Sequence, residues 1–170
     1  MLAVDLRGHG SSTQEDLAWT DLDDSRRGKV WSFASRDVKA GADYLLDRSE
    51  IHASNLSVVG VGHGCSLAVR HAIDDENTRA VVLVAPQVEN FGFNLSKGIA
   101  DLEGLPTLII VPQDRRDDAS RLQTAGNRAN GDDFIDLAVV KADPTALMTE
   151  SRTRKEAADW LSKQVMPRKR

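Results

Sequence analysis

Four apolar runs of strand length constrain the fold of this chain more than any other feature of its sequence. They lie at residues 56–61, 80–85, 106–111 and 133–140, with segments of helical periodicity between them. Runs that lack alternation between polar and apolar residues are typical of strands buried on both faces of a parallel sheet. We therefore expect an α/β fold, with a mostly parallel sheet and helices on both faces.

The remaining segments complete one domain that spans residues 1–170. The segments with helical periodicity are 35–47, 64–74, 118–129 and 149–164. Ser35 begins the first of them and is its expected N-cap. The run "LAVDL" at 2–6 predicts a further short strand, and the polar stretch 11–33 predicts a loop with one helical turn at most. A second loop with a short helix is expected at 87–104.

Composition excludes several classes of function. The net charge is -4 and the isoelectric point is about 5.5. Because no excess of basic residues is present, we expect no nucleic-acid partner. No apolar run approaches the ~18 residues that a membrane helix needs. Cys65 is the only cysteine, which excludes an internal disulfide and a cysteine zinc site. We expect a cytoplasmic protein with no cofactor and no metal.

Four segments carry a resemblance to one superfamily. They are "VDLRGHGSS" (4–12), "LSVVGVGHGCSLAV" (56–69), "PTLIIVPQD" (106–114) and "DLAVVKADPTALM" (136–148). In this order they resemble four segments of the α/β-hydrolases: a strand with its loop, the nucleophile elbow, the strand of the triad acid, and the strand and loop of the histidine. The chain is most similar to the dienelactone-hydrolase and esterase branch. The resemblance implies an α/β-hydrolase fold and a carboxylic ester or lactone as ligand.

The resemblance also assigns positions to the catalytic triad. The elbow places its nucleophile on a strained turn between a strand and a helix. The matching residue here is Gly62, flanked by Gly60 and Gly64, and a shift of two residues would put Gly64 in that slot instead. Neither glycine has a side chain that could attack a substrate. The acid slot matches Asp114, with Asp117 as the alternative.

The histidine slot falls at Pro144, which can neither accept nor donate a proton through its side chain. The family order is nucleophile, acid, histidine. The four histidines of the chain are His9, His52, His63 and His71. None of them follows the acid slot, so the proton relay of acyl transfer cannot be built in the family's way. We therefore assign no catalytic residue and expect a degenerate elbow.

Other residues near the elbow admit alternatives. Cys65 lies in the first helical turn, where the helix dipole lowers a thiol pKa, although an isolated cysteine is more often a buried packing residue. Ser66 is expected to cap the helix. His63 is either a pocket-wall residue or a contact to a ligand. A dinucleotide-binding turn is disfavoured, because the third small position is Cys65 and the next strand ends in "VAPQ" without an acid.

Three hypotheses of function remain at this point. The first is a non-catalytic relative that binds an ester-like small molecule or a protein partner. The second is a working ester or lactone hydrolase that uses Cys65 or His63. The third is an assembly protein that pairs with another chain, or with itself, through an open sheet edge. That edge is expected because the resemblance begins part-way through the family's fold, as in an N-terminally truncated chain.

Overall fold

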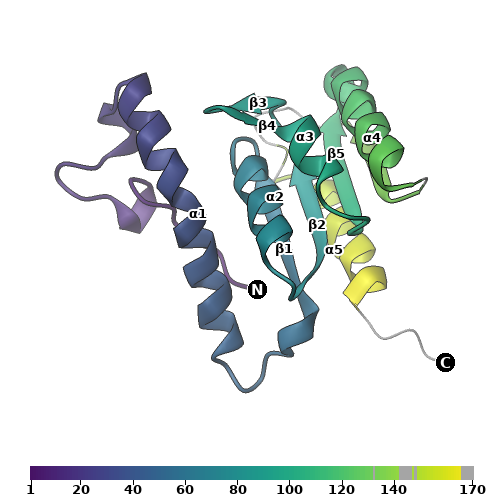
Figure 1. Ribbon diagram of the computed structural model, residues 1–170, viewed down its shortest axis with the longest axis horizontal. Coiled ribbons are helices and arrows are strands. Elements are labelled where there is room, and N and C mark those ends of the chain that lie inside the picture. The colour runs from purple at the N-terminus through teal and green to yellow at the C-terminus, as the bar shows by residue number, and fades with distance from the viewer. Residues whose placement is uncertain (132, 142–146, 148, 166–170) are drawn as a thin grey trace. The chain divides into compact units, whose positions relative to one another are not determined.

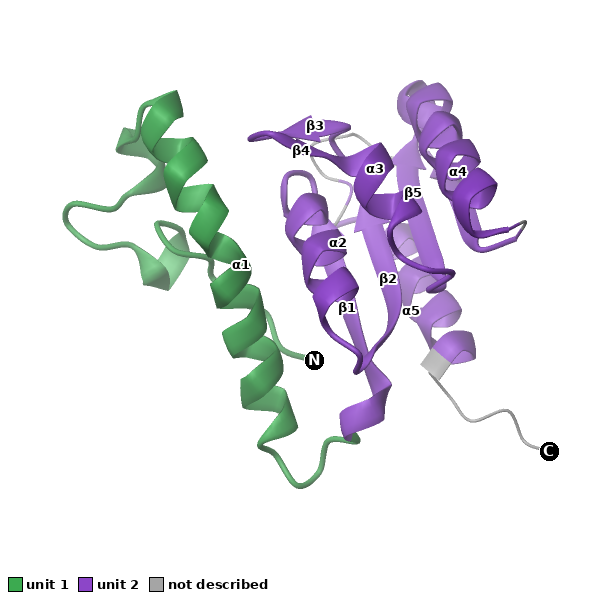
Figure 2. Cartoon of the chain, viewed as in Figure 1, with its two compact units in different colours: residues 1–52 green, residues 53–170 purple. Residues whose placement is uncertain are grey.

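The computed structural model describes residues 1–131, 133–141, 147 and 149–165. The chain forms two compact units, residues 1–52 and residues 53–170, which Figure 2 colours separately. Among the described residues, no helix combines the length and the apolar character that a membrane crossing requires.

The second unit contains the predicted parallel sheet. Its strand order is β1-β2-β5-β6, and each strand runs parallel to its neighbours (Figure 1). The strands are β1 (Leu56–Val61), β2 (Thr78–Val84), β5 (Thr107–Pro112) and β6 (Ile135–Val140). All four apolar runs of the sequence therefore become strands of one sheet.

Helices cover both faces of this sheet, as predicted. The main helices are α2 (Gly64–Asp74), α3 (Leu95–Ala100), α4 (Arg116–Asn130) and α5 (Ser151–Val165). Val81 and Leu83 of β2 point into one core cluster together with residues of α2, α3 and α4. Val82 and Val84 point into the other cluster, where they meet Trp160 of α5. The period of two along β2 thus divides its side chains between two buried cores.

The connection after β2 contains an element that the sequence did not predict. A small antiparallel hairpin, formed by β3 (Glu89–Asn90) and β4 (Phe93–Asn94), precedes α3. The carboxamide of Asn94 accepts a hydrogen bond from the Lys97 backbone N–H at 3.0 Å and so caps α3. The chain therefore enters α3 directly from the hairpin.

The first unit consists of a long helix, α1 (Asp24–Leu46), with two short 3₁₀ helices, η1 (Gly10–Ser12) and η2 (Trp19–Asp21), before it. Two expectations are wrong here. Residues 2–6 form no strand, because no described strand pairs with them. The helix begins at Asp24 rather than near Ser35, because the Asp23 carboxylate accepts the Arg26 backbone N–H at 2.8 Å and supplies the cap earlier.

Candidate functional site

The turn between β1 and α2 has the shape of a nucleophile elbow. The strand ends at Val61 and the helix begins at Gly64, so the turn comprises Gly62 and His63. Gly62 has a φ of +54°, in the left-handed region that glycine adopts at little cost. Its backbone N–H donates a 2.8 Å hydrogen bond to the carbonyl oxygen of Val84 at the end of β2. The left-handed tip is therefore Gly62, whereas Gly64 is helical.

The flanking glycines have different environments. A Cβ atom on Gly60 would lie 2.6 Å from the Cα atom of Cys65 and 2.7 Å from the carbonyl oxygen of Gly64. Strand and helix thus approach too closely for a side chain at position 60. A Cβ atom on Gly62 or Gly64 would meet no atom within 4 Å. The tip of the turn therefore opens into free space.

Cys65 and Ser66, the residues that follow in α2, are both buried. Cys65 is fully buried, and its thiol donates a long hydrogen bond of 3.5 Å to the carbonyl oxygen of Val84. Burial raises the pKa of the Cys65 thiol, which therefore stays protonated. The prediction that Ser66 caps α2 is wrong. Its hydroxyl donates to the His63 carbonyl oxygen at 2.9 Å instead of accepting a backbone N–H.

The β3–β4 hairpin contacts the elbow through two residues. The buried Asn90 carboxamide donates to the carbonyl oxygen of His63 at 3.1 Å and to the hydroxyl of Ser66 at 2.9 Å. The rings of His63 and Phe91 have centroids 5.7 Å apart. Sequence reasoning missed Asn90, because its partners lie more than twenty residues earlier in the chain and a lone asparagine in a loop gives no sign of them.

The acid slot lies at the same edge of the sheet as the elbow. Asp114 is exposed in a 3₁₀ helix, η4 (Gln113–Arg115), which follows β5 directly. The carboxyl ends of β1 and β5 share one sheet edge and are two strand spacings apart, roughly 10 Å. Asp117 is also exposed and lies in the first turn of α4. Pro144, the histidine slot, lies outside the described residues.

Of the other histidines, His71 has a partner close to it in the sequence. His71 lies near the end of α2 and pairs with Asp75, with 3.5 Å between Nε2 and the carboxylate. His9 and His52 belong to the first unit. In the part of the chain that the structure describes, no group of three or more His, Cys, Asp or Glu residues could hold a metal ion.

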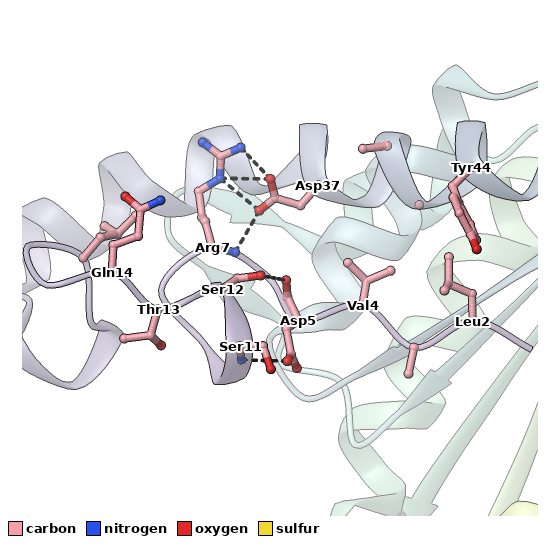
Figure 3. A pocket seen from close by; sticks show the side chains of 14 residues that line it. Leu2, Val4, Asp5, Arg7, Ser11, Ser12, Thr13, Gln14, Asp37 and Tyr44 are labelled. Atoms are coloured by element: carbon pink, nitrogen blue, oxygen red, sulfur yellow. Dashed lines mark hydrogen bonds and ion pairs between the residues drawn. The ribbon is translucent and has the colours of Figure 1, made fainter.

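The "RGHG" segment forms a braced loop beside a surface pocket of the first unit (Figure 3). The Arg7 guanidinium donates to both carboxylate oxygens of Asp37, and the Arg7 backbone N–H donates to the same carboxylate at 2.9 Å. Burial would raise the pKa of Asp37, but the hydrogen bonds from Arg7 outweigh it and lower that pKa. The Asp5 carboxylate accepts the Ser11 backbone N–H at 2.9 Å.

His9 supports the same loop. Its Nδ1 lies 3.2 Å from the carbonyl oxygen of Arg7, to which the ring N–H can donate, and its ring lies 4.9 Å from that of Trp19. Within the first unit, the charges of Arg7 and Asp37 pair with each other, and the Asp5 carboxylate accepts a backbone N–H. They account for the shape of the loop without any reaction.

Comparison with solved structures shows the same fold. An esterase from Pyrococcus furiosus, Pf2001, has a TM-score of 0.64 and 15% sequence identity, over 79% of this chain and 62% of that one. A second crystal form of Pf2001 gives a TM-score of 0.64 and 15% identity, over 80% of this chain and 63% of that one. A zinc-bound cold-adapted esterase from an Arctic intertidal metagenomic library gives 0.62 and 15%, over 86% and 66%.

This chain thus spans less than two thirds of the length of these esterases. Among curated proteins, none matches it. A family model described as "Alpha/beta hydrolase family" matches residues 1–168, nearly the whole sequence. The parallel sheet and the strand-to-helix turn at Gly62 agree with this match. The chain therefore belongs to the alpha/beta hydrolase family.

Proposed function

We propose that this protein is a hydrolase-fold binding protein whose elbow no longer carries a nucleophile. One observation carries the proposal: the left-handed tip of the elbow is Gly62, and the space that a nucleophilic side chain would enter is open. Pro144 in the histidine slot supports it from the sequence. The ligand class is an ester- or lactone-like small molecule, of the kind handled by the dienelactone-hydrolase and esterase branch, in a cytoplasmic setting.

The competing hypothesis of a working hydrolase requires another nucleophile. Cys65 suits that role poorly, since it is fully buried and its thiol pKa is raised. His63 is adjacent to the tip and is the stronger candidate. Hydrolysis of p-nitrophenyl butyrate separates the two hypotheses. We expect no turnover above the buffer rate from the wild type, and none from Gly62→Ser, because no histidine follows the acid slot.

Turnover by the wild type that disappears in His63→Ala would refute the proposal and establish the working hydrolase. Binding is tested separately with the uncleaved amide N-(4-nitrophenyl)butanamide by ligand-observed NMR. Gly62→Asn fills the open space with a residue that tolerates left-handed backbone, so it should weaken binding. Gly104→Asn is the matched control, because Gly104 also has a positive φ and open space but lies in the loop before β5.

A second candidate function is assembly with a second copy through strand β1. Among the described strands, β1 pairs with β2 alone, and it contains no charged residue. Val59 and Val61 of β1 are 44% and 45% exposed. The opposite edge strand, β6, differs from β1 because it carries a charged residue, Asp136, whose carboxylate accepts the Trp160 indole N–H. Uncharged edge strands favour pairing with another chain. The assembly hypothesis therefore predicts pairing of β1 with β1 of a second copy.

Sedimentation velocity over a wide range of concentrations tests this assembly. We expect a concentration-dependent dimer that Val59→Lys abolishes. Ile73→Lys is the control, since Ile73 is also an exposed aliphatic residue but lies on α2. A wild type that sediments as a monomer at every concentration would refute the assembly hypothesis.

A further inference from the structure

Residues 2–4 form a short segment that α1 holds in place within the first unit. A Cβ atom on Gly41 of α1 would lie 2.8 Å from Cγ2 of Val4 and 3.5 Å from Cδ2 of Leu2, so these alternate side chains both pack on the helix at this glycine (Figure 3). Side chains two residues apart share a face in an extended strand. Glycine inside a helix is destabilising relative to alanine, but here it allows the segment to lie close to the helix. The segment therefore has the shape of a strand with one face already covered.

The main chain of this segment lacks the neighbour that a strand requires. Among the described residues, none forms a hydrogen bond with the N–H or C=O groups of Leu2, Ala3 or Val4. The next main-chain group along, the Asp5 carbonyl oxygen, accepts the Ser12 hydroxyl at 2.9 Å. Leu2, Ala3 and Val4 are all exposed and uncharged. Unpaired, uncharged edges of this kind favour pairing with another strand.

Strand β1 is an edge of the same kind. Among the described strands it pairs with β2 alone, it carries no charge, and Val59 and Val61 are exposed on it. Each copy of the chain thus has two apolar edges without a strand partner in the part that the structure describes. A dimer that pairs β1 with β1 leaves residues 2–4 of both copies unpaired. Pairing of residues 2–4 with β1 in both directions satisfies all four edges, so main-chain hydrogen bonding favours it.

We propose that two copies of the chain exchange these edges, so that residues 2–4 of each copy pair with the outer edge of β1 in the other. The inference rests on the assembly hypothesis, because both use the same edge of β1, but it names residues 2–4 as the partner in place of β1. Strand addition draws its affinity from main-chain hydrogen bonds. Because α1 already holds the segment in place, the segment loses little conformational freedom when it pairs.

Sedimentation velocity over a wide range of concentrations tests the exchange. Ala3→Glu places an unpaired charge in both contacts of the dimer and should raise its Kd about tenfold, whereas the neutral control Ala3→Gln should leave the Kd close to that of the wild type. Gly41→Ala should displace Val4 from α1 and raise the Kd several-fold. Gly28→Ala is its matched control, because Gly28 lies in the same helix with no atom within 4 Å of an added Cβ. This second pair keeps the test decisive if Ala3→Glu does not fold.

Mixing Ala3→Glu with Val59→Lys decides between the two partners of β1. In the exchange, a mixed pair keeps one contact unchanged and brings opposite charges together in the other, so the mixture should form dimers at concentrations where each variant alone is a monomer. A mixture that stays monomeric would overturn the exchange. Ala3→Glu dimers as stable as those of the wild type would also overturn it and would leave pairing of β1 with β1. A wild type that is a monomer at every concentration would refute both, so the two failures are distinguishable.

Discussion

Alanine substitution at each elbow glycine should separate three physical reasons for glycine. Gly60→Ala should be the most damaging, because its Cβ would lie 2.6 Å from the Cα atom of Cys65 and 2.7 Å from the Gly64 carbonyl oxygen. Carbon atoms in contact rest at about 3.5–4.0 Å. Both obstructing atoms belong to the backbone, so β1 and α2 must move apart. We expect a cost near the upper end of overpacking, about 3 kcal/mol of the free energy of unfolding.

The other two substitutions lack any clash. Gly62→Ala enters open space but must keep a φ of +54°, which costs a residue with a Cβ atom about 1–2 kcal/mol. Gly64→Ala also enters open space, at the first residue of α2, where alanine is the better helix former. It should raise the free energy of unfolding by about 0.5 kcal/mol.

Urea unfolding followed by circular dichroism measures all three variants against the wild type. The predicted order of stability, from lowest to highest, is Gly60→Ala, Gly62→Ala, wild type, Gly64→Ala. Gly60→Ala should lower the melting temperature by about 6–12 °C. A Gly60→Ala variant within about 0.5 kcal/mol of Gly62→Ala would show that strand and helix are not in close contact at this turn, and would refute the reasoning.

Three further predictions concern buried or paired polar groups. Above about pH 8.5 the unfolded chain ionises Cys65 while the buried thiol stays protonated, so the free energy of unfolding should fall by up to about 1.4 kcal/mol per pH unit. Urea titrations at alkaline pH should show this slope in the wild type and not in Cys65→Ala. The folded pKa of Asp37 is lowered, so its stabilisation is present above about pH 4 and lost in acid. Asp37→Asn should therefore cost about 1 kcal/mol at neutral pH, and the difference should vanish in acid unfolding curves. Asp75→Asn replaces the carboxylate that accepts the Thr78 hydroxyl at 2.7 Å with a weaker, neutral acceptor. It should lower the free energy of unfolding by about 1–2 kcal/mol, measured by thermal unfolding.

The sequence predicted best where local signals and burial agree. The strand at 56–61 and the helix at 64–74 match β1 and α2 residue for residue, since a β-branched run, a glycine turn and an amphipathic helix are all local features. The run at 2–6 is also mostly apolar but forms no strand. A strand also needs a neighbour, and composition cannot supply that information.

Long-range contacts account for what the sequence could not predict at the site. Asn90 reaches residues 24 and 27 positions earlier, so no local pattern announces its role. For Cys65 the sequence offered two opposing effects, a helix dipole that lowers the thiol pKa and burial that raises it. The structure shows complete burial, and that effect dominates.

The elbow keeps its backbone shape by contacts that involve no catalytic side chain. Gly62 donates its N–H to Val84, and Gly60 allows β1 to approach the first turn of α2. With glycine at the tip, the left-handed conformation costs little, so this turn needs no functional group to justify it. The shape of an elbow is therefore a property of how a strand joins a helix. An elbow shape becomes a sign of catalysis only when a nucleophile stands on it, which is why the proposal here rests on Gly62 and its open space rather than on the turn.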